Sequence, residues 1–289
     1  MAISAAMVKE LRERTGLGMM DCKRALTEAD GDMEKAIEEL RKKSALKAAK
    51  KAGRTTANGL LGIKVADDGS RGAIVEINIE TDFAAKNEKF IAFVAKVTEQ
   101  LFDSADGDLA ALSAGELNAE RETLVQEIGE NITIRRGEVL TSAAGGISQY
   151  MHGDQRRGAL VDLTVANAEL GRDVAMHVVA INPMVVRSED VAPEVLEKER
   201  EIFASQAADS GKPEEIVVKM VEGRVKKFLA EVSLLDQPFV KDGDIKVSKL
   251  LADAGAEVAS FVRYEVGEGI EVEEMDFAAE VAAQVAGND

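Results

Sequence analysis

Few side chains in this sequence are of the types that carry out acid–base, nucleophilic or metal chemistry. His152 and His177 are the two histidines, and neither has a cysteine, histidine or carboxylate at the spacing of a metal site. His177 lies in the mostly apolar segment AMHVVAIN, so we expect a hydrogen-bonded core residue. Cys22 would need a neighbouring base and a positive environment to act as a nucleophile, and we expect it to pack as a small hydrophobe. The many carboxylates fit solvated helix faces and form no recognisable acid–base pair.

Nucleotide-binding loops are also missing from the sequence. The phosphate-cradling pattern G-x-x-x-x-G-K-[ST] does not occur. Gly16-Leu17-Gly18 resembles the start of a dinucleotide-binding fingerprint, but the third glycine is absent and no predicted strand precedes it. The sequence therefore predicts no cofactor, no bound metal and no chemical reaction of its own, and it favours a protein that works by docking onto another protein.

Charge and composition predict a folded protein whose first segment differs electrostatically from the rest. The 289 residues are 46% hydrophobic and 31% charged, which suffices for one to three globular domains. The net charge of −17 disfavours a nucleic-acid partner, because backbone binding requires a positive surface. Residues 1–56 carry 13 Lys or Arg against 9 Asp or Glu, which indicates a separate module.

The sequence is typical of a cytoplasmic protein. A single cysteine allows no intramolecular disulfide, which fits a reducing compartment. The N-terminal segment carries charges from Lys9 onward and has no apolar run before a cleavage site, so we expect no signal peptide. No stretch approaches the ~18–20 uncharged apolar residues of a membrane-spanning helix, so we expect no membrane association.

Hydrophobic periodicity begins with helices. Residues 1–43 predict three short helices, separated by Thr15-Gly16-Leu17-Gly18 and Ala29-Asp30-Gly31-Asp32, with Asp32 suited to cap the third. Residues 44–58 have almost no large apolar side chain and predict a helical or flexible connector. Three helices of this length form a small bundle near the lower size limit for independent folding.

The order strand, strand, helix then occurs twice. Strands over 59–65 and 73–79 precede a helix over 88–102. About 86 residues later the order returns, and Gly72-Ala73-Ile74-Val75-Glu76-Ile77 matches Gly158-Ala159-Leu160-Val161-Asp162-Leu163 in kind at every position. Six matching positions in register, with matching flanks, favour two related α+β subdomains over a chance similarity.

An insertion interrupts the second subdomain. A helix over 193–209 and a second helix ending near Leu229 are joined by Gly211-Lys212-Pro213, which predicts an antiparallel helical hairpin. A short helix over 247–254 and a strand over 257–264 follow. We predict an α+β fold with a helical module and connector over 1–56, core subdomains over 57–143 and 144–270, the hairpin insertion over 191–230, and a C-terminal module over 271–289.

Motifs along the whole chain resemble the bacterial translation elongation factor Ts family. Each alone is weak, but they occur in family order and are specific together. The matching segments are Leu11-Arg12-Glu13-Arg14-Thr15-Gly16, Gly18-Met19-Met20-Asp21-Cys22-Lys23, Glu80-Thr81-Asp82-Phe83-Ala84-Ala85-Lys86, Ile128-Gly129-Glu130-Asn131-Ile132, Met176-His177-Val178, Glu265-Val266-Gly267-Glu268-Gly269-Ile270 and Asp276-Phe277-Ala278-Ala279-Glu280-Val281.

The resemblance implies an architecture and a function. Family members have a ubiquitin-associated-like three-helix module, a two-part core, a coiled-coil insertion and a C-terminal helix. They are guanine-nucleotide exchange factors that bind the GDP form of elongation factor Tu, the GTPase that carries aminoacyl-tRNA, and speed GDP release. Exposed helical hairpins often serve association, so a homodimer through the hairpin or the core stays open.

The turn Thr81-Asp82-Phe83-Ala84 has two readings. By local rules, Thr81 or Asp82 caps a helix and Phe83 packs beneath it. The family resemblance implies instead that this turn inserts into the GTPase domain of the partner and disturbs its Mg²⁺ site, with Phe83 as the wedge.

Further partner contacts are implied at residues that local rules assign to structure. Adjacent methionines point in different directions on a helix, so we expect one of the pair to be exposed. Gly129 is suited to end a helix before a strand over 132–134. The resemblance implies contacts from Met19, Met20, Lys23, Ile128, Gly129, His152, Asp276 and Phe277.

Two rival functions remain on this sequence. A ubiquitin-associated-type scaffold would share the first helices but gives no reason for the repeated core. A small metabolic enzyme would use the cleft between the subdomains and would need a convergent set of polar residues there.

Overall fold

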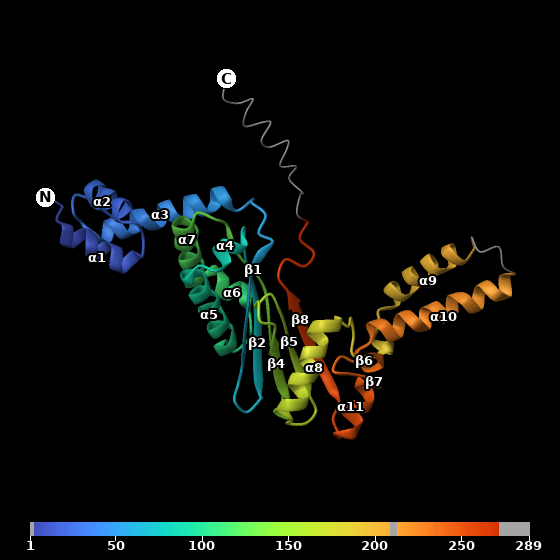
Figure 1. The fold of residues 1–289 in the computed structure, drawn as a ribbon. Coiled ribbons are helices and arrows are strands. Elements are labelled where there is room, and N and C mark those ends of the chain that lie inside the picture. Colours follow the sequence, from blue (N-terminus) through green and yellow to red (C-terminus); the bar gives the residue numbers. More distant parts are fainter. Residues whose placement is uncertain (1–2, 209–212, 272–289) are drawn as a thin grey trace.

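The computed structural model describes residues 3–208 and 213–271 of the chain. Helices form the N-terminal end, two small antiparallel sheets form the centre, and a helical hairpin projects at the far side (Figure 1). The predicted α+β class is confirmed. No observation tests the predicted domain bounds, which stay a prediction.

Three helices make the N-terminal module: α1 (Ala5–Thr15), α2 (Met19–Glu28) and α3 (Met33–Lys51). Gly16 ends α1 with a left-handed φ of 72°. The Asp32 side chain caps α3 by accepting a hydrogen bond of 3.1 Å from the Lys35 N–H, as predicted. The buried side chains are small or aliphatic, and Cys22 packs among them, as expected.

The first sheet has the strand order β1 (Asn58–Val65), β2 (Arg71–Ile79), β3 (Ile132–Thr141). Four helices accompany it: α4 (Asp82–Ala85), α5 (Glu88–Asp103), α6 (Leu109–Ala114) and α7 (Glu116–Ile128). Helix α5, predicted over 88–102, buries one apolar face against β2. The sequence patterns did not predict α6, which is only six residues long, or the start of α7, where charged residues separate the few apolar ones.

The connector after the N-terminal bundle is helical up to Lys51, because α3 continues through it. Ser44 and Ala48 are buried there. The Ser44 hydroxyl donates to Gln126 Oε1 on α7 at 2.8 Å. The connector therefore packs through small residues, which lets α3 approach α7 closely.

The second sheet repeats the first, with the order β4 (Ile147–Met151), β5 (Arg157–Leu163), β8 (Val258–Glu265). The helices α8 (Ala168–Ile181) and α11 (Val247–Asp253) pack on it, and a small ribbon of β6 (Pro238–Phe239) and β7 (Asp242–Lys246) lies nearby. The central strands β2 and β5 shift register between Glu76 and Ile77 and between Asp162 and Leu163, which are equivalent positions of the predicted repeat. This shared irregularity supports the repeat.

The two sheets pack face to face, and the helices cover their outer faces. Leu61 and Ile74 from the first sheet meet Ile147, Leu160 and Val262 from the second. Helices, sheet, sheet and helices therefore form successive layers (Figure 1).

A fully buried carboxylate, Glu76, joins the two sheets at one end of their interface. It accepts hydrogen bonds from Arg135 at 2.9 Å, Arg136 at 2.6 Å, Asn78 at 3.0 Å and the Gly267 N–H at 2.8 Å. Burial alone raises the pKa of the Glu76 carboxyl, but these donors outweigh it and hold the pKa below its usual value. The chain after β8 is thereby fastened to β2.

Gly267 is required at this junction. Its φ is +81°, and a Cβ there would lie 2.3 Å from the Ala57 carbonyl oxygen. Any larger residue would push the loop away from Glu76.

The predicted hairpin is present as α9 (Pro193–Ala208) and α10 (Glu214–Val232). Ala207, Val221 and Val225 are buried between the helices, and the Phe203 and Phe228 rings meet edge to face with centroids 6.5 Å apart. Gly211 and Lys212 of the predicted turn lie outside the described residues, as does the predicted C-terminal helix from Asp276. A homodimer through this hairpin or the core stays a prediction.

His177 is a satisfied core residue, as expected. Its Nδ1 accepts from the Val240 N–H at 3.1 Å, so Nε2 carries the proton and donates to Gln237 Oε1 at 2.9 Å. Burial lowers the pKa of His177, although the hydrogen bond to Gln237 opposes this.

Within the described ranges, no helix combines the length and the apolar character needed to cross a membrane.

We expect Glu76→Gln to destabilise the fold by about 3 kcal/mol, because it leaves the partly buried Arg135 guanidinium without its counter-charge and leaves Arg136 with Glu268 alone. Urea unfolding followed by circular dichroism measures the change. Glu138→Gln removes an exposed carboxylate from β3 and serves as the matched control. Equal, small effects of both substitutions would contradict the role of Glu76.

We also expect the protein to become less stable as the pH decreases, because His177 is buried in its neutral form. Its pKa is lower in the folded than in the unfolded chain, so the neutral ring contributes stability fully above the ordinary pKa of 6.5 and progressively less below it. Unfolding free energies from about pH 7.5 down to about pH 5.5 should decline in the wild type and in His152→Gln, and decline less in His177→Gln. Identical pH slopes in all three would show that His177 does not contribute.

Candidate functional site

A single helical turn, α4, follows the end of β2 and forms an exposed tip. Thr81 precedes it, and its hydroxyl accepts a hydrogen bond of 3.2 Å from the Ala84 N–H. Thr81 is thus the cap that local rules predict. The expectation that Phe83 packs beneath the helix is wrong, because its side chain is 80% exposed. Ala85 and the partly buried Ala84 face the core instead.

Charged side chains flank the exposed Phe83 ring. Lys86 Nζ lies 5.5 Å from the ring centroid and 3.1 Å from Asp82 Oδ2. Large aromatic side chains left in solvent on a folded protein are typical of binding surfaces. The tip therefore presents an aromatic group beside an exposed ion pair.

The loop after α7 lies against the base of this tip. Gly129 ends α7 with a left-handed φ of 87°, as predicted, and its N–H donates to Val125 O at 3.0 Å. Ile128 packs partly buried against the first core. The next residue, Glu130, accepts hydrogen bonds from Thr81. The structure therefore places Ile128 and Gly129 beside the tip.

Sequence reasoning missed Glu130 as a residue of the site. Its bonds to Thr81 span 49 positions of the chain, and no local pattern predicts a contact over that separation. Two signals were available: Glu130 directly follows the glycine cap of α7, and it lies within the segment Ile128-Gly129-Glu130-Asn131-Ile132 that resembles the family.

Both Met19 and Met20 are exposed at the start of α2, by 54% and 74%. The sequence predicted that one methionine of the pair is exposed, whereas both are. Lys23 is exposed one turn later. Cys22, Ala25 and Leu26 supply the buried face of α2, so the methionines are not needed for the core.

Helix α7 connects this methionine surface with the tip. It packs against α3 through Ser44 and Gln126, and the Gln126 amide reaches Asp21 Oδ2 on α2 at 3.5 Å. Lys89 on α5 donates to Gly16 O at 3.4 Å. The N-terminal module and the tip are therefore attached to the same helix.

His152 lies apart from the tip, in the turn between β4 and β5. Its Nδ1 is 3.0 Å from Asp154 Oδ1. Burial raises the pKa of Asp154, but donors from Arg156, His152 and Arg157 outweigh it and lower the pKa. The same turn reaches the tip indirectly, because Arg156 donates to Asn58 Oδ1 at 3.0 Å and Asn58 donates to Glu80 O at 2.9 Å.

Asp276 and Phe277, the remaining predicted contacts, lie outside the described residues. Nothing in the fold tests whether the described contacts touch a partner, so they stay predictions.

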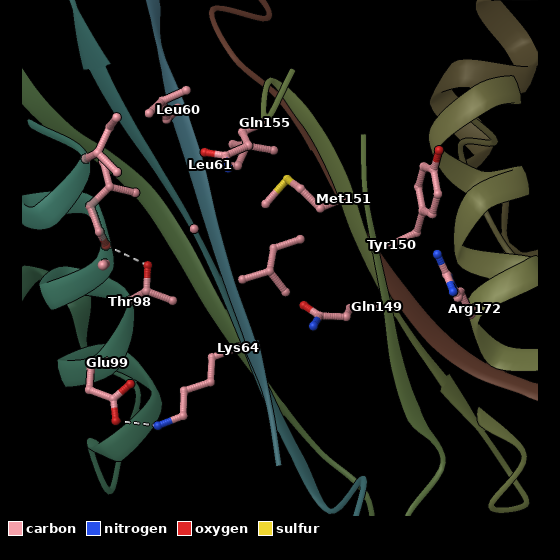
Figure 2. Close-up of a pocket in the computed structure, with 15 residues that line it drawn as sticks. Leu60, Leu61, Lys64, Thr98, Glu99, Gln149, Tyr150, Met151, Gln155 and Arg172 are labelled. Atoms are coloured by element: carbon pink, nitrogen blue, oxygen red, sulfur yellow. Dashed lines mark hydrogen bonds and ion pairs between the residues drawn. The ribbon is translucent and has the colours of Figure 1, made fainter. Parts of the chain in front are cut away.

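A cleft of about 720 Å³ opens between β1, β4, α5 and α8. Figure 2 shows an ion pair between Lys64 and Glu99 on one side and Arg172 beside Tyr150 on the other. Thr98 is turned toward its own helix, where its hydroxyl donates to Val94 O at 2.7 Å. Within residues 3–208 and 213–271, no group of His, Cys, Asp or Glu side chains is arranged to hold a metal ion.

Comparison with known proteins points to one family. The family model described as elongation factor TS matches residues 80–268. The chain is 59% identical over 286 residues to the elongation factor Ts of Hahella chejuensis, with 99% of both chains covered. It is 57% identical over 286 residues to that of Saccharophagus degradans, again with 99% of both covered. The chain therefore belongs to the elongation factor Ts family.

Proposed function

We propose that this protein is a guanine-nucleotide exchange factor that binds the GDP form of elongation factor Tu during translation elongation. The match to the elongation factor TS family model and the similarity over 99% of the chain to elongation factor Ts proteins support this role. The protein carries out no reaction of its own; it works by binding a GTPase and changing the affinity of that GTPase for GDP. We expect this to occur in the cytoplasm.

The exposed Phe83 is the observation that carries the mechanism. A GTPase holds GDP partly through a Mg²⁺ ion that bridges to phosphate oxygens. An aromatic wedge that displaces the elements holding this ion weakens GDP binding without touching the nucleotide. Phe83 suits this role because it is a large rigid side chain on a short, anchored helix. Asp82, held near Lys86, adds directed polar contacts beside the ring.

The other exposed residues extend the proposed contact surface. Met19, Met20 and Lys23 offer apolar area and a positive charge on a module that is net positive in sequence, which favours an acidic partner surface. Ile128 and Gly129 flank the tip, and His152 with the segment around Asp276 and Phe277 are proposed contacts farther along the chain. By linkage, if this protein lowers the affinity of the GTPase for GDP, then GDP lowers the affinity of the GTPase for this protein by the same ratio. Exchange is therefore reversible.

We expect Phe83→Ala to slow catalysed GDP release by about 30-fold, the loss of one buried aromatic anchor worth ~2 kcal/mol. Stopped-flow release of fluorescent GDP from preloaded elongation factor Tu measures it. Leu46→Ala truncates a side chain that is 63% exposed on α3 and is the matched control. Thermal unfolding should be unchanged in both variants. An unaltered rate for Phe83→Ala would refute the wedge.

We expect Asp82→Asn to slow release less than Phe83→Ala, by about 3-fold, because a surface charge orients the ring but supplies little binding energy. The same stopped-flow assay at two salt concentrations checks this, since an electrostatic contribution weakens as salt rises. A larger effect for Asp82→Asn than for Phe83→Ala would reverse the assigned roles.

The wild-type assay also separates the rival functions. Fast GDP release supports exchange. Binding to the GDP-loaded GTPase without release supports a recruiting scaffold, and no binding at all would return attention to the cleft between β1 and β4.

A further inference from the structure

Two segments of the chain bind one another through exchanged carboxylates at the base of the tip. Glu130 Oε2 accepts from the Thr81 N–H at 2.9 Å, and its Oε1 accepts from the Thr81 hydroxyl at 2.8 Å. In return, Glu80 Oε1 accepts from the Asn131 N–H at 2.6 Å. Residues 80–81 and 130–131 thus each offer a carboxylate to the backbone of the other. We name these four residues the clasp.

The clasp controls the cap of α4 through a single proton. The Thr81 hydroxyl has one hydrogen, which it donates in a hydrogen bond to Glu130. This turns an oxygen lone pair toward the Ala84 N–H, which donates to it at 3.2 Å. Helix α4 has four residues, so this cap is a large share of the hydrogen bonding that defines it. The orientation of Phe83 therefore depends on a residue outside the tip.

The clasp is itself anchored on both sides. The Asn131 side chain donates to Ala52 O at 3.3 Å and to Arg54 O at 3.1 Å, just after α3. Lys51 donates to Gly129 O, and the Arg54 guanidinium lies 3.4 Å from Glu80 Oε2. Hydrogen bonds to carboxylates are stronger than neutral ones. Hydrogen bonds and an ion pair consequently join the end of α3, the loop after α7 and the tip.

We propose that Glu130 is a positioning residue for nucleotide exchange: it holds the Thr81–Phe83 tip in the conformation that enters the partner. This inference rests on the proposed exchange function. A tip that is ordered in advance transmits its binding energy to the displaced elements of the partner, whereas a loose tip spends that energy on its own ordering. Loss of the clasp therefore lowers the maximal rate of GDP release more than it lowers the affinity of the two proteins.

The test uses full-length variants with fluorescent GDP on elongation factor Tu, at rising concentrations of this protein. Glu130→Gln removes the charge but keeps the size of the side chain, and we expect a maximal release rate lower by about tenfold, with the half-saturating concentration changed by less than about threefold. Glu120→Gln breaks the ion pair between Glu120 on α7 and Lys96 on α5, away from the tip, and is the matched control.

Substitutions of Thr81 test the proton itself. Thr81→Val is nearly isosteric but has no hydroxyl, and we expect the same loss of maximal rate as in Glu130→Gln. Thr81→Ser returns the hydroxyl, and we expect it to recover the rate relative to Thr81→Val. Hydrogen exchange of the Ala84 amide should be faster in Glu130→Gln and Thr81→Val than in the control.

The outcomes are distinguishable from failure of the proposed function. If the wild-type protein releases no GDP, the exchange function is wrong. If the wild type is active and Phe83→Ala is slow, but Glu130→Gln keeps the wild-type maximal rate, the clasp has no positioning role. A loss confined to affinity, or an equal loss in Glu120→Gln, would also overturn it.

Discussion

A carboxylate buried between two sheets requires its counter-charges in place before the sheets can close, and Glu76 meets this requirement with Arg135 and Arg136 from the neighbouring strand. The Arg136 guanidinium also lies 4.3 Å from the centroid of the Tyr264 ring on β8. One polar cluster thus contacts both sheets and the loop that follows them. Apolar packing alone would let the sheets slide, whereas directed hydrogen bonds fix one arrangement.

The position of the tip follows from this arrangement. Strand β2 carries Glu76 at its centre and leads directly to Thr81, so whatever fixes β2 also fixes the start of α4. Strand β3 carries the two arginines and begins just after Asn131 of the clasp. The same pair of strands therefore holds the sheets together at one point and the tip at another.

Local patterns in the sequence were sufficient for most of the fold. Apolar spacing predicted α5, α9 and α10, and the matching of Gly72–Ile77 with the later segment anticipated two equivalent central strands. Helix α6 escaped prediction because its six residues are too few to show a helical period. Strand β3 extends well beyond the predicted residues 132–134. The prediction stopped early because the middle of the strand carries the two arginines that bind Glu76, and these interrupt the apolar pattern.

In the candidate site, too, features set by neighbouring residues were predictable and features set by the assembled fold were not. Caps such as Thr81 and Gly129 follow from short-range geometry and were predictable. Local rules did not predict the exposure of Phe83, because a helix of one turn has no period that reveals which side faces the core; the family resemblance alone implied that this side chain points outward. The bonds from Glu130 to Thr81 depend on how β2 and α7 end side by side, which only the assembled fold determines.

The hairpin of α9 and α10 leaves and re-enters the second subdomain at neighbouring positions. The Met184 N–H donates to Val232 O at 2.8 Å, and the Leu234 N–H donates to Val185 O at 2.9 Å. The entry and exit segments are thus hydrogen-bonded to one another at the base of the hairpin, where α10 ends. Whole helical turns can be gained or lost beyond these hydrogen bonds without moving the two chain ends that connect the hairpin to the core. The arm is therefore free to vary in length during evolution, while the sheets that carry the tip stay under constraint.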